Sequence, residues 1–180
     1  MHEKLYEKDS GSTENELDKI NDWAKKLGYG KILDKQKGNN AVMGMYKDPI
    51  LNIDVAIVDG GHGGNVFLPI IFEGYSFIDG ILLIEEPEIS LHPGAQGDVL
   101  DFFIEMVGQR NHQIIFTSHS EYFLKKIIRY YRNKRINEEL IDIIVTFKES
   151  EGITIKRMRL DELAESFKGK KEILPELTKR

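Results

Sequence analysis

Three glutamates and a proline directly follow a short apolar run in the middle of the sequence. The run is Ile81 to Ile84, and Glu85, Glu86, Pro87 and Glu88 come next. A short apolar run that ends abruptly in charge is typical of a buried strand whose carboxyl end opens into a site. Carboxylates gathered at such a place can bind hard cations. The plain alternative is a buried strand followed by a solvated acidic loop.

A second apolar run, Gln113 to Phe116, ends in hydroxyl residues on both sides of His119. Between the two runs, Ala95 to Val107 carries apolar residues at the spacing of one helix face. This order of a strand, a helix and a second strand leaves no room for a hairpin. It predicts two parallel strands joined by a right-handed crossover. We therefore expect Glu85, Glu86 and His119 at the same edge of one sheet.

A glycine-rich segment lies upstream of both runs. Gly60, Gly61, Gly63 and Gly64 surround His62, and we expect Asn65 to cap a helix that begins at Val66. Glycines before a helix N-terminus let backbone amides approach a phosphate, where the helix dipole favours negative charge. The alternative is a plain glycine hinge.

Together these segments resemble the soluble ABC-type ATPases, in particular the group with RecF-like, SMC-like and OLD (overcoming lysogenization defect) proteins. The string Ile81 to Pro93, with its EEPE and LHP, is similar to the Walker B motif and D-loop of that group. Ser118-His119-Ser120 is similar to its H-loop, and Asp59 to Ile71 to its signature segment. The resemblance covers roughly residues 50 to 125. It implies ATP and Mg²⁺ as cofactors.

The resemblance also implies a role for each matching residue. Glu85 would help to hold Mg²⁺, Glu86 would orient the attacking water, and His119 would contact the terminal phosphate. The D-loop, which passes between subunits, would include Ser90, Leu91 and His92. The signature segment, which presses on the nucleotide of a second subunit, would be Gly61, His62, Gly63, Gly64 and Asn65. His62 stands where the family pattern has serine, and Asn65 where it has glutamine.

The 180 residues contain no G-x-x-x-x-G-K-[ST] motif, which forms the backbone cradle for nucleotide phosphates. We therefore expect an α/β fold that is a partial P-loop NTPase of ABC type, the C-terminal half of such an ATPase. ATP hydrolysis would need a Walker A lobe, and the isolated chain would be inactive. The expected partner is a second copy or a partner ATPase lobe.

The sequence is also compatible with two other functions. The chain could be a non-catalytic interaction module that retains the ATPase fold. It could also be a metal-dependent nuclease that binds two cations with Glu85, Glu86, Glu88, His92 and His119.

Composition excludes several classes of protein. Zero cysteines exclude disulfides and thiolate metal sites. The sequence has no signal peptide and no run long enough for a membrane span, so we expect a cytoplasmic protein without membrane contact. A net charge of -5 argues against a uniformly basic nucleic-acid binder. One basic cluster, Lys125 to Arg135, offers either a solvated helix face or a contact with nucleic acid.

The expected organisation is a loose segment, 1–12, followed by a single domain, 13–180. Its parts are a helix and small antiparallel sheet (13–58), the signature segment (59–75), the Walker B to H-loop core (81–147), and a C-terminal hairpin and helix (148–180). The first helix begins at Thr13 and ends at Gly28, and we expect its Trp23 to pack in the core. Leu163 and Phe167 would anchor the last helix. The expected strands are Lys31–Leu33, Ala41–Tyr46, Leu51–Val58, Ile141–Phe147 and Ile153–Met158.

Overall fold

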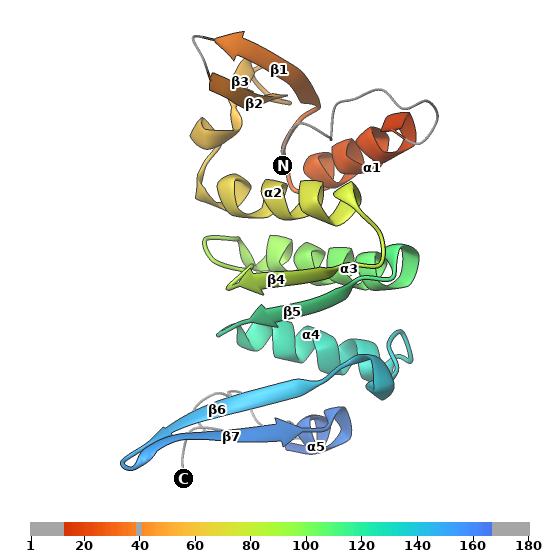
Figure 1. Cartoon of the computed structure of the whole chain (residues 1–180), viewed down its shortest axis with the longest axis vertical. Coiled ribbons are helices and arrows are strands. Elements are labelled where there is room, and N and C mark those ends of the chain that lie inside the picture. The colour runs from red at the N-terminus through yellow and green to blue at the C-terminus, as the bar shows by residue number, and fades with distance from the viewer. Residues whose placement is uncertain (1–12, 39–40, 167–180) are drawn as a thin grey trace. The chain divides into compact units, whose positions relative to one another are not determined.

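The computed structural model describes residues 13–38 and 41–166 (Figure 1). The chain divides after Ser118 into two compact units. The first contains three helices and five strands of the described chain, and the second contains a helix, a β-hairpin and a short final helix.

The first unit contains a parallel pair of strands joined by a helix, as the sequence predicts (Figure 1). Strand β4 (Ile81–Glu85) pairs with β5 (Gln113–Thr117), and α3 (Pro93–Arg110) connects them. Leu82 is buried, and Phe116 meets Phe103 of α3 with ring centroids 5.2 Å apart. Successive strand residues face opposite sides, so one face of the pair packs on α3 and the other carries exposed apolar residues.

Aromatic rings join the helices of the first unit around Phe102. Trp23 of α1 (Thr13–Lys26) meets Phe102 edge-on at 5.3 Å, and Phe67 and Tyr75 of α2 (His62–Ser76) lie at 5.7 and 6.0 Å. Trp23 is 8% exposed, so its predicted core position is confirmed. The helix ends as the sequence indicates, because Gly28 adopts a positive φ of 88° just after α1.

The predicted small antiparallel sheet before the glycine-rich segment is also confirmed. Its strands are β1 (Ile32–Gly38), β2 (Ala41–Lys47) and β3 (Asp54–Ala56), in that order. The first strand continues beyond the expected Leu33. Ile32 is anchored to α1, because its backbone N–H donates to Asn21 Oδ1 at 2.8 Å.

The expected strand over Leu51–Val58 is wrong at both ends. Asp48 Oδ1 accepts the backbone N–H groups of Ile50 and Leu51 at 2.8 and 2.7 Å, which closes a turn where the strand was expected. At the other end, Ile57–Asp59 forms a 3₁₀ helix, η2. The alternating apolar pattern does not reflect burial, since Leu51 and Ile53 are 66% and 53% exposed.

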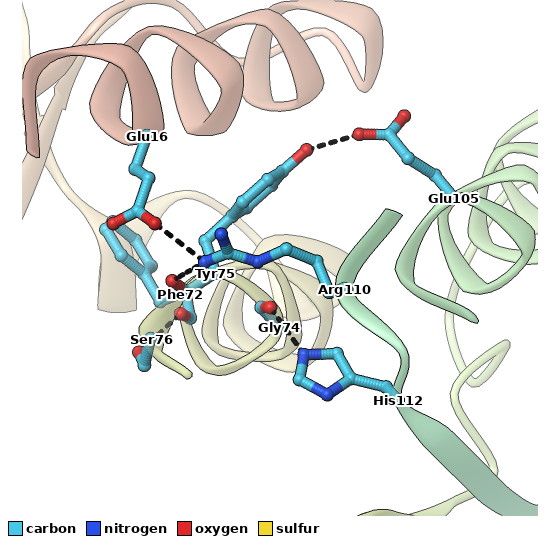
Figure 2. A network of polar contacts seen from close by, with 8 residues as sticks. All are labelled: Glu16, Phe72, Gly74, Tyr75, Ser76, Glu105, Arg110 and His112. Atoms are coloured by element: carbon cyan, nitrogen blue, oxygen red, sulfur yellow. Dashed lines mark hydrogen bonds and ion pairs between the residues drawn. The ribbon is translucent and has the colours of Figure 1, made fainter. Parts of the chain in front are cut away.

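A polar network lies between α1, α2 and α3 (Figure 2). The guanidinium of Arg110 pairs with Glu16 Oε1 at 2.8 Å and donates to the backbone carbonyl of Tyr75. The Tyr75 hydroxyl donates to Glu105 Oε1 at 2.5 Å. Burial, then the hydrogen bond and charge of Glu105, raise the pKa of Tyr75 far above its ordinary value. The network therefore keeps the Tyr75 phenol protonated to a higher pH than an exposed tyrosine.

His112 lies beside this network and contacts the Gly74 carbonyl of α2 (Figure 2), and it directly precedes β5. Its Nδ1 accepts the N–H of Gly80, which precedes β4, at 3.2 Å. Its Nε2 lies 2.9 Å from the Gly74 carbonyl of α2. A carbonyl can only accept, so Nε2 carries the proton and the ring is neutral. This buried histidine positions the strands from the end opposite to Glu85.

The second unit packs a hairpin against two helices. Its elements are α4 (Glu121–Arg132), η3 (Glu138–Leu140), β6 (Ile143–Glu149), β7 (Gly152–Met158) and α5 (Leu160–Ser166). The antiparallel pairing of β6 and β7 confirms the predicted C-terminal hairpin. Ile128, Met158, Leu163 and Ala164 form its core. Leu163 is fully buried, as expected, and Phe167 lies outside the described residues.

Candidate functional site

The acidic turn leaves the sheet at the carboxyl ends of β4 and β5. Glu85 is the last residue of β4, is exposed, and pairs with Thr117, the last residue of β5. The backbone N–H of Glu86 donates to the Thr117 carbonyl at 3.1 Å and lies 3.3 Å from Thr117 Oγ1. Ligands of open parallel sheets bind outside this end of the strands. The structure therefore brings the two predicted carboxylates to the type of edge where ligands bind.

The turn that follows β4 has an unusual backbone. Glu86 has a φ of 45° and Ser90 a φ of 59°, both in the left-handed region. For a non-glycine residue this conformation costs about 1–2 kcal/mol, and it persists where surrounding contacts enforce it. Two backbone hydrogen bonds close the turn, from Ile89 N–H to the Glu86 carbonyl at 2.9 Å and from Leu91 N–H to the Glu88 carbonyl at 3.1 Å.

Glu88 points back to the end of β5. Its side chain is only 8% exposed, and its Oε1 accepts the Ser118 hydroxyl at 2.5 Å. The sequence predicts Glu88 only as one ligand of a nuclease site, and it predicts Ser118 only as part of a motif, without a role of its own. The one signal for the pair was a hydroxyl residue directly after a strand that the topology places beside the acidic turn.

The predicted D-loop touches the predicted signature segment within the first unit. A Cβ added to Gly63 would lie 2.8 Å from Leu91 Cδ2 and 3.3 Å from the Ser90 carbonyl oxygen. His92 is the N-cap of α3, and its Nδ1 accepts the backbone N–H of Gly94 at 3.2 Å. Glycine at position 63 thus permits a close approach that a larger residue would prevent.

The predicted helix start at Val66 is wrong, because α2 begins at His62. Its N-cap is Gly61, with a φ of 90° that favours glycine, and Asn65 lies in the helix rather than capping it. The Asn65 amide instead donates to the Val58 carbonyl at 3.0 Å. Glycine is tolerated in this first turn because it allows close packing, since Gly64 lies against the Tyr29 phenol. The exposed His62 stands at the helix N-terminus, where backbone amides lack intrahelical acceptors.

His119 begins the second unit, one residue after Ser118. Its neighbour Ser120 is the N-cap of α4, and its hydroxyl accepts the Phe123 N–H at 3.3 Å. The end of β5 therefore lies beside the acidic turn, whereas the meeting of the His119 and Glu86 side chains stays a prediction.

The nuclease interpretation required a cluster of carboxylates and histidines. Among residues 13–38 and 41–166, no group of three or more His, Asp or Glu side chains is arranged to hold a metal ion. Glu88 is turned toward Ser118, and His92 caps α3. The arrangement does not support a two-metal nuclease site.

Several side chains of the basic cluster have partners inside the second unit. Lys125 pairs with Glu121 at 3.1 Å, Arg132 donates to the Ala164 carbonyl at 2.9 Å, and Lys126 and Arg135 flank the Tyr130 ring. These contacts give the cluster a structural role. Nucleic-acid binding through this helix stays a prediction.

Fold and site together define a class of protein: an α/β fold with an acidic turn at the carboxyl edge of a parallel strand–helix–strand unit. Comparison with family models agrees. The chain belongs to the AAA ATPase domain family, whose model matches residues 1–124. This match spans every predicted site residue, including His119.

Sixteen chains of solved structures also match. One comes from work described as "Structural biochemistry of ATP-driven dimerization and DNA stimulated activation of SMC ATPases"; it covers 93% of both chains with a TM-score of 0.59 and 13% identity. At this identity the likeness shows the fold alone, and it confirms the predicted P-loop NTPase-type fold. No curated protein sequence matches the chain. In the described part of the chain, no helix is long and apolar enough to cross a membrane.

Proposed function

We propose that the chain is one lobe of an ABC-type ATPase and supplies the Walker B, signature, D-loop and H-loop elements. The observation that carries this proposal is the pairing of Glu85 with Thr117 across two parallel strands. Because of this pairing, the acidic turn and the Thr117–His119 segment leave the sheet at the same edge. Membership of an ATPase family supports nucleotide hydrolysis at that edge.

Glu85 is the residue that helps to hold Mg²⁺. Magnesium usually keeps several waters and takes only one or two protein carboxylates together with substrate phosphates. An exposed carboxylate at a strand end fits this requirement without a cluster of three ligands. When bound, the ion neutralises charge that develops on the phosphate oxygens.

Glu86 acts on water in this proposal. A carboxylate at this position orients and polarises the attacking water, and phosphoryl transfer depends on such positioning more than on covalent chemistry. The hydrogen bonds from Glu86 N–H to Thr117 support a fixed backbone for that task. His119 contacts the terminal phosphate.

The signature segment acts on a second subunit. The amides of His62, Gly63 and Gly64 in the first turn of α2 offer donors to a phosphate, and the helix dipole favours negative charge there. Ser90, Leu91 and His92 form the D-loop at the same interface. The SMC ATPases of the similar structure are described as undergoing ATP-driven dimerization, which supports a nucleotide-dependent dimer.

A Walker A lobe completes the site. No G-x-x-x-x-G-K-[ST] motif occurs in the 180 residues, so the phosphate cradle comes from another polypeptide or from another part of a longer chain. We expect the isolated 180-residue chain neither to bind ATP tightly nor to hydrolyse it.

The experiment measures ATP hydrolysis by the isolated chain and by the chain combined with its Walker A lobe. We expect turnover only in the combination, and Glu86→Gln should lower kcat by about 10²–10⁴-fold, the range for loss of a general base. Turnover by the pure chain that Glu86→Gln abolishes would contradict the need for a second lobe. ATP binding without turnover in the combination would favour the non-catalytic interaction module.

A further inference from the structure

The strained backbone at Glu86 requires an explanation beyond its own hydrogen bonds. Its φ of 45° is unfavourable for a glutamate, and the residue lies in a turn only half shielded from solvent. Thr117 accepts from the Glu86 N–H, and the Ile89 N–H donates to the Glu86 carbonyl within the turn, but these bonds attach only the first residue of the turn to β5. A second attachment farther along the turn would prevent the backbone from relaxing.

The structure contains such an attachment two residues later. Ser118 Oγ donates to Glu88 Oε1 at 2.5 Å, and Glu88 is 8% exposed. Pro87, between the two glutamates, is fully buried and restricts the backbone φ. Hydrogen bonds to a carboxylate in a poorly solvated site are stronger than neutral hydrogen bonds. The end of β5 therefore forms hydrogen bonds with the turn at two places, from Thr117 to Glu86 and from Ser118 to Glu88.

We propose that the Ser118–Glu88 hydrogen bond positions Glu86 for catalysis, with Ser118 and Glu88 as positioning residues rather than catalytic ones. This role rests on the function proposed above for Glu86. The hydrogen bond joins residues 30 positions apart and locks the acidic turn to the strand that leads to His119. Without this hydrogen bond, the backbone of the turn relaxes from the left-handed conformation. The Glu86 carboxylate then moves away from the position in which it orients the attacking water.

A first experiment needs no ATPase activity. Residue-resolved amide exchange, measured by NMR on the 180-residue chain, reports whether the Glu86 N–H stays bonded to Thr117. Ser118→Ala should raise the exchange rate of this amide by about tenfold or more, because the turn opens locally. Ser118→Thr retains the hydroxyl and should restore slow exchange. An unchanged Glu86 exchange rate in Ser118→Ala would overturn the proposal.

Ser76→Ala is the matched control. Ser76 ends α2, and its hydroxyl also makes one hydrogen bond in the first unit, to the Phe72 carbonyl of the same helix at 2.6 Å. This variant should leave the Glu86 amide protected. Equal acceleration of Glu86 exchange in both serine variants would indicate a general loss of stability and would also overturn the proposal.

The second experiment uses the ATPase completed with its Walker A lobe. Ser118→Ala and Glu88→Ala should each lower kcat by about 10–100-fold with little change in KM, because misplacement of a reacting group slows the chemical step. The double variant should be no slower than the worse single variant, since both changes break one hydrogen bond. Additive effects on kcat, or an unchanged kcat in Ser118→Ala, would contradict the positioning role.

The two proposals fail in different ways. An unsubstituted assembly that binds its partner lobe but does not hydrolyse ATP would contradict the proposed function. The amide exchange of the isolated chain would still decide whether Ser118 holds the turn at Glu86.

Discussion

Glu85 and Thr117 are register partners at the last positions of two parallel strands. The acidic turn follows Glu85 in sequence, and Ser118 follows Thr117. Both segments therefore start from the same edge of the sheet. The hydrogen bonds of Glu86 and Glu88 to Thr117 and Ser118 show how this edge organises the turn. Five predictions test the site and the packing that supports it.

Glu85 and Glu86 should respond differently to magnesium. In the completed ATPase, Glu85→Gln should raise the Mg²⁺ concentration for half-maximal turnover by about tenfold or more, as loss of a metal-site partner does. Glu86→Gln should lower kcat and leave that concentration unchanged. Steady-state turnover across a magnesium titration measures both effects. A raised magnesium requirement in Glu86→Gln alone would reverse the assigned roles.

The open face of the parallel strands should cause self-association of the chain. Ile81, Leu83 and Ile115 are 60%, 74% and 53% exposed on this face, although both faces of parallel sheets are normally covered. Light scattering should show a mass that rises with concentration into the high micromolar range. Leu83→Ser combined with Ile115→Ser should weaken the association by about tenfold or more, since burying one such side chain contributes about 1.5–3 kcal/mol.

The control for this association is Leu140→Ser, because Leu140 is a similarly exposed leucine of the second unit, at 65%. It should leave the mass unchanged. A chain that stays strictly monomeric would refute both the self-association and the role of the open face.

Two glycines in helices should respond oppositely to alanine. A Cβ at Gly74 would lie 2.6 Å from Phe102 Cζ and 2.9 Å from Met106 Sδ, so Gly74→Ala should lower the free energy of unfolding by about 1–3 kcal/mol through overpacking. Gly108 has no atom within 4 Å of that position, so Gly108→Ala should raise it by about 0.5–1 kcal/mol. Denaturant unfolding measures both. A stabilising Gly74→Ala would mean that α2 and α3 are packed less tightly than described.

The buried His112 should matter for stability more than the exposed His92. His112→Ala leaves the Gly74 carbonyl and the Gly80 N–H without their partner and opens a cavity beside Phe77, at a cost of about 2–4 kcal/mol. His92→Ala removes one exposed helix cap and should cost no more than about 1 kcal/mol. Chemical denaturation of the two variants gives the comparison. Equal costs would remove His112 from its structural role.

Tyr75 should make stability fall at alkaline pH. Its pKa is raised in the folded chain by burial and by Glu105, from an ordinary value of 10.0. Above about pH 10 the unfolded chain therefore loses this proton while the folded chain keeps it, so folding stability decreases as pH rises, by at most about 1.4 kcal/mol per pH unit for one proton. Below pH 10 the contribution is complete. Unfolding titrations between pH 9 and 11 should show a smaller alkaline loss in Tyr75→Phe than in the unsubstituted chain.

The matched control is Tyr122→Phe, which removes a hydroxyl from a tyrosine that is 42% exposed. That tyrosine lies outside the network around Tyr75 and Glu105. If Tyr75→Phe behaves in the same way as Tyr122→Phe, the phenol of Tyr75 is not held protonated by folding.

The sequence by itself determined the strand–helix–strand unit and the edge that carries Glu85. Two short apolar runs separated by a helical stripe leave few arrangements other than a parallel pair, because a crossover helix forces the strands to run the same way. The buried position of Trp23 was also predictable, because burial follows helix periodicity. The hairpin of β6 and β7 was indicated by two strand-like runs around Gly152.

Only the tertiary structure decided the details that shape the candidate site. The turn at Asp48 and the start of α2 at His62 depend on side-chain contacts that compete with local propensity. The left-handed backbone of Glu86 and the Ser118–Glu88 hydrogen bond join segments about 30 residues apart in sequence. Local patterns carry no information about such contacts, because their free energy arises only when the folded chain brings both segments to the same edge of the sheet.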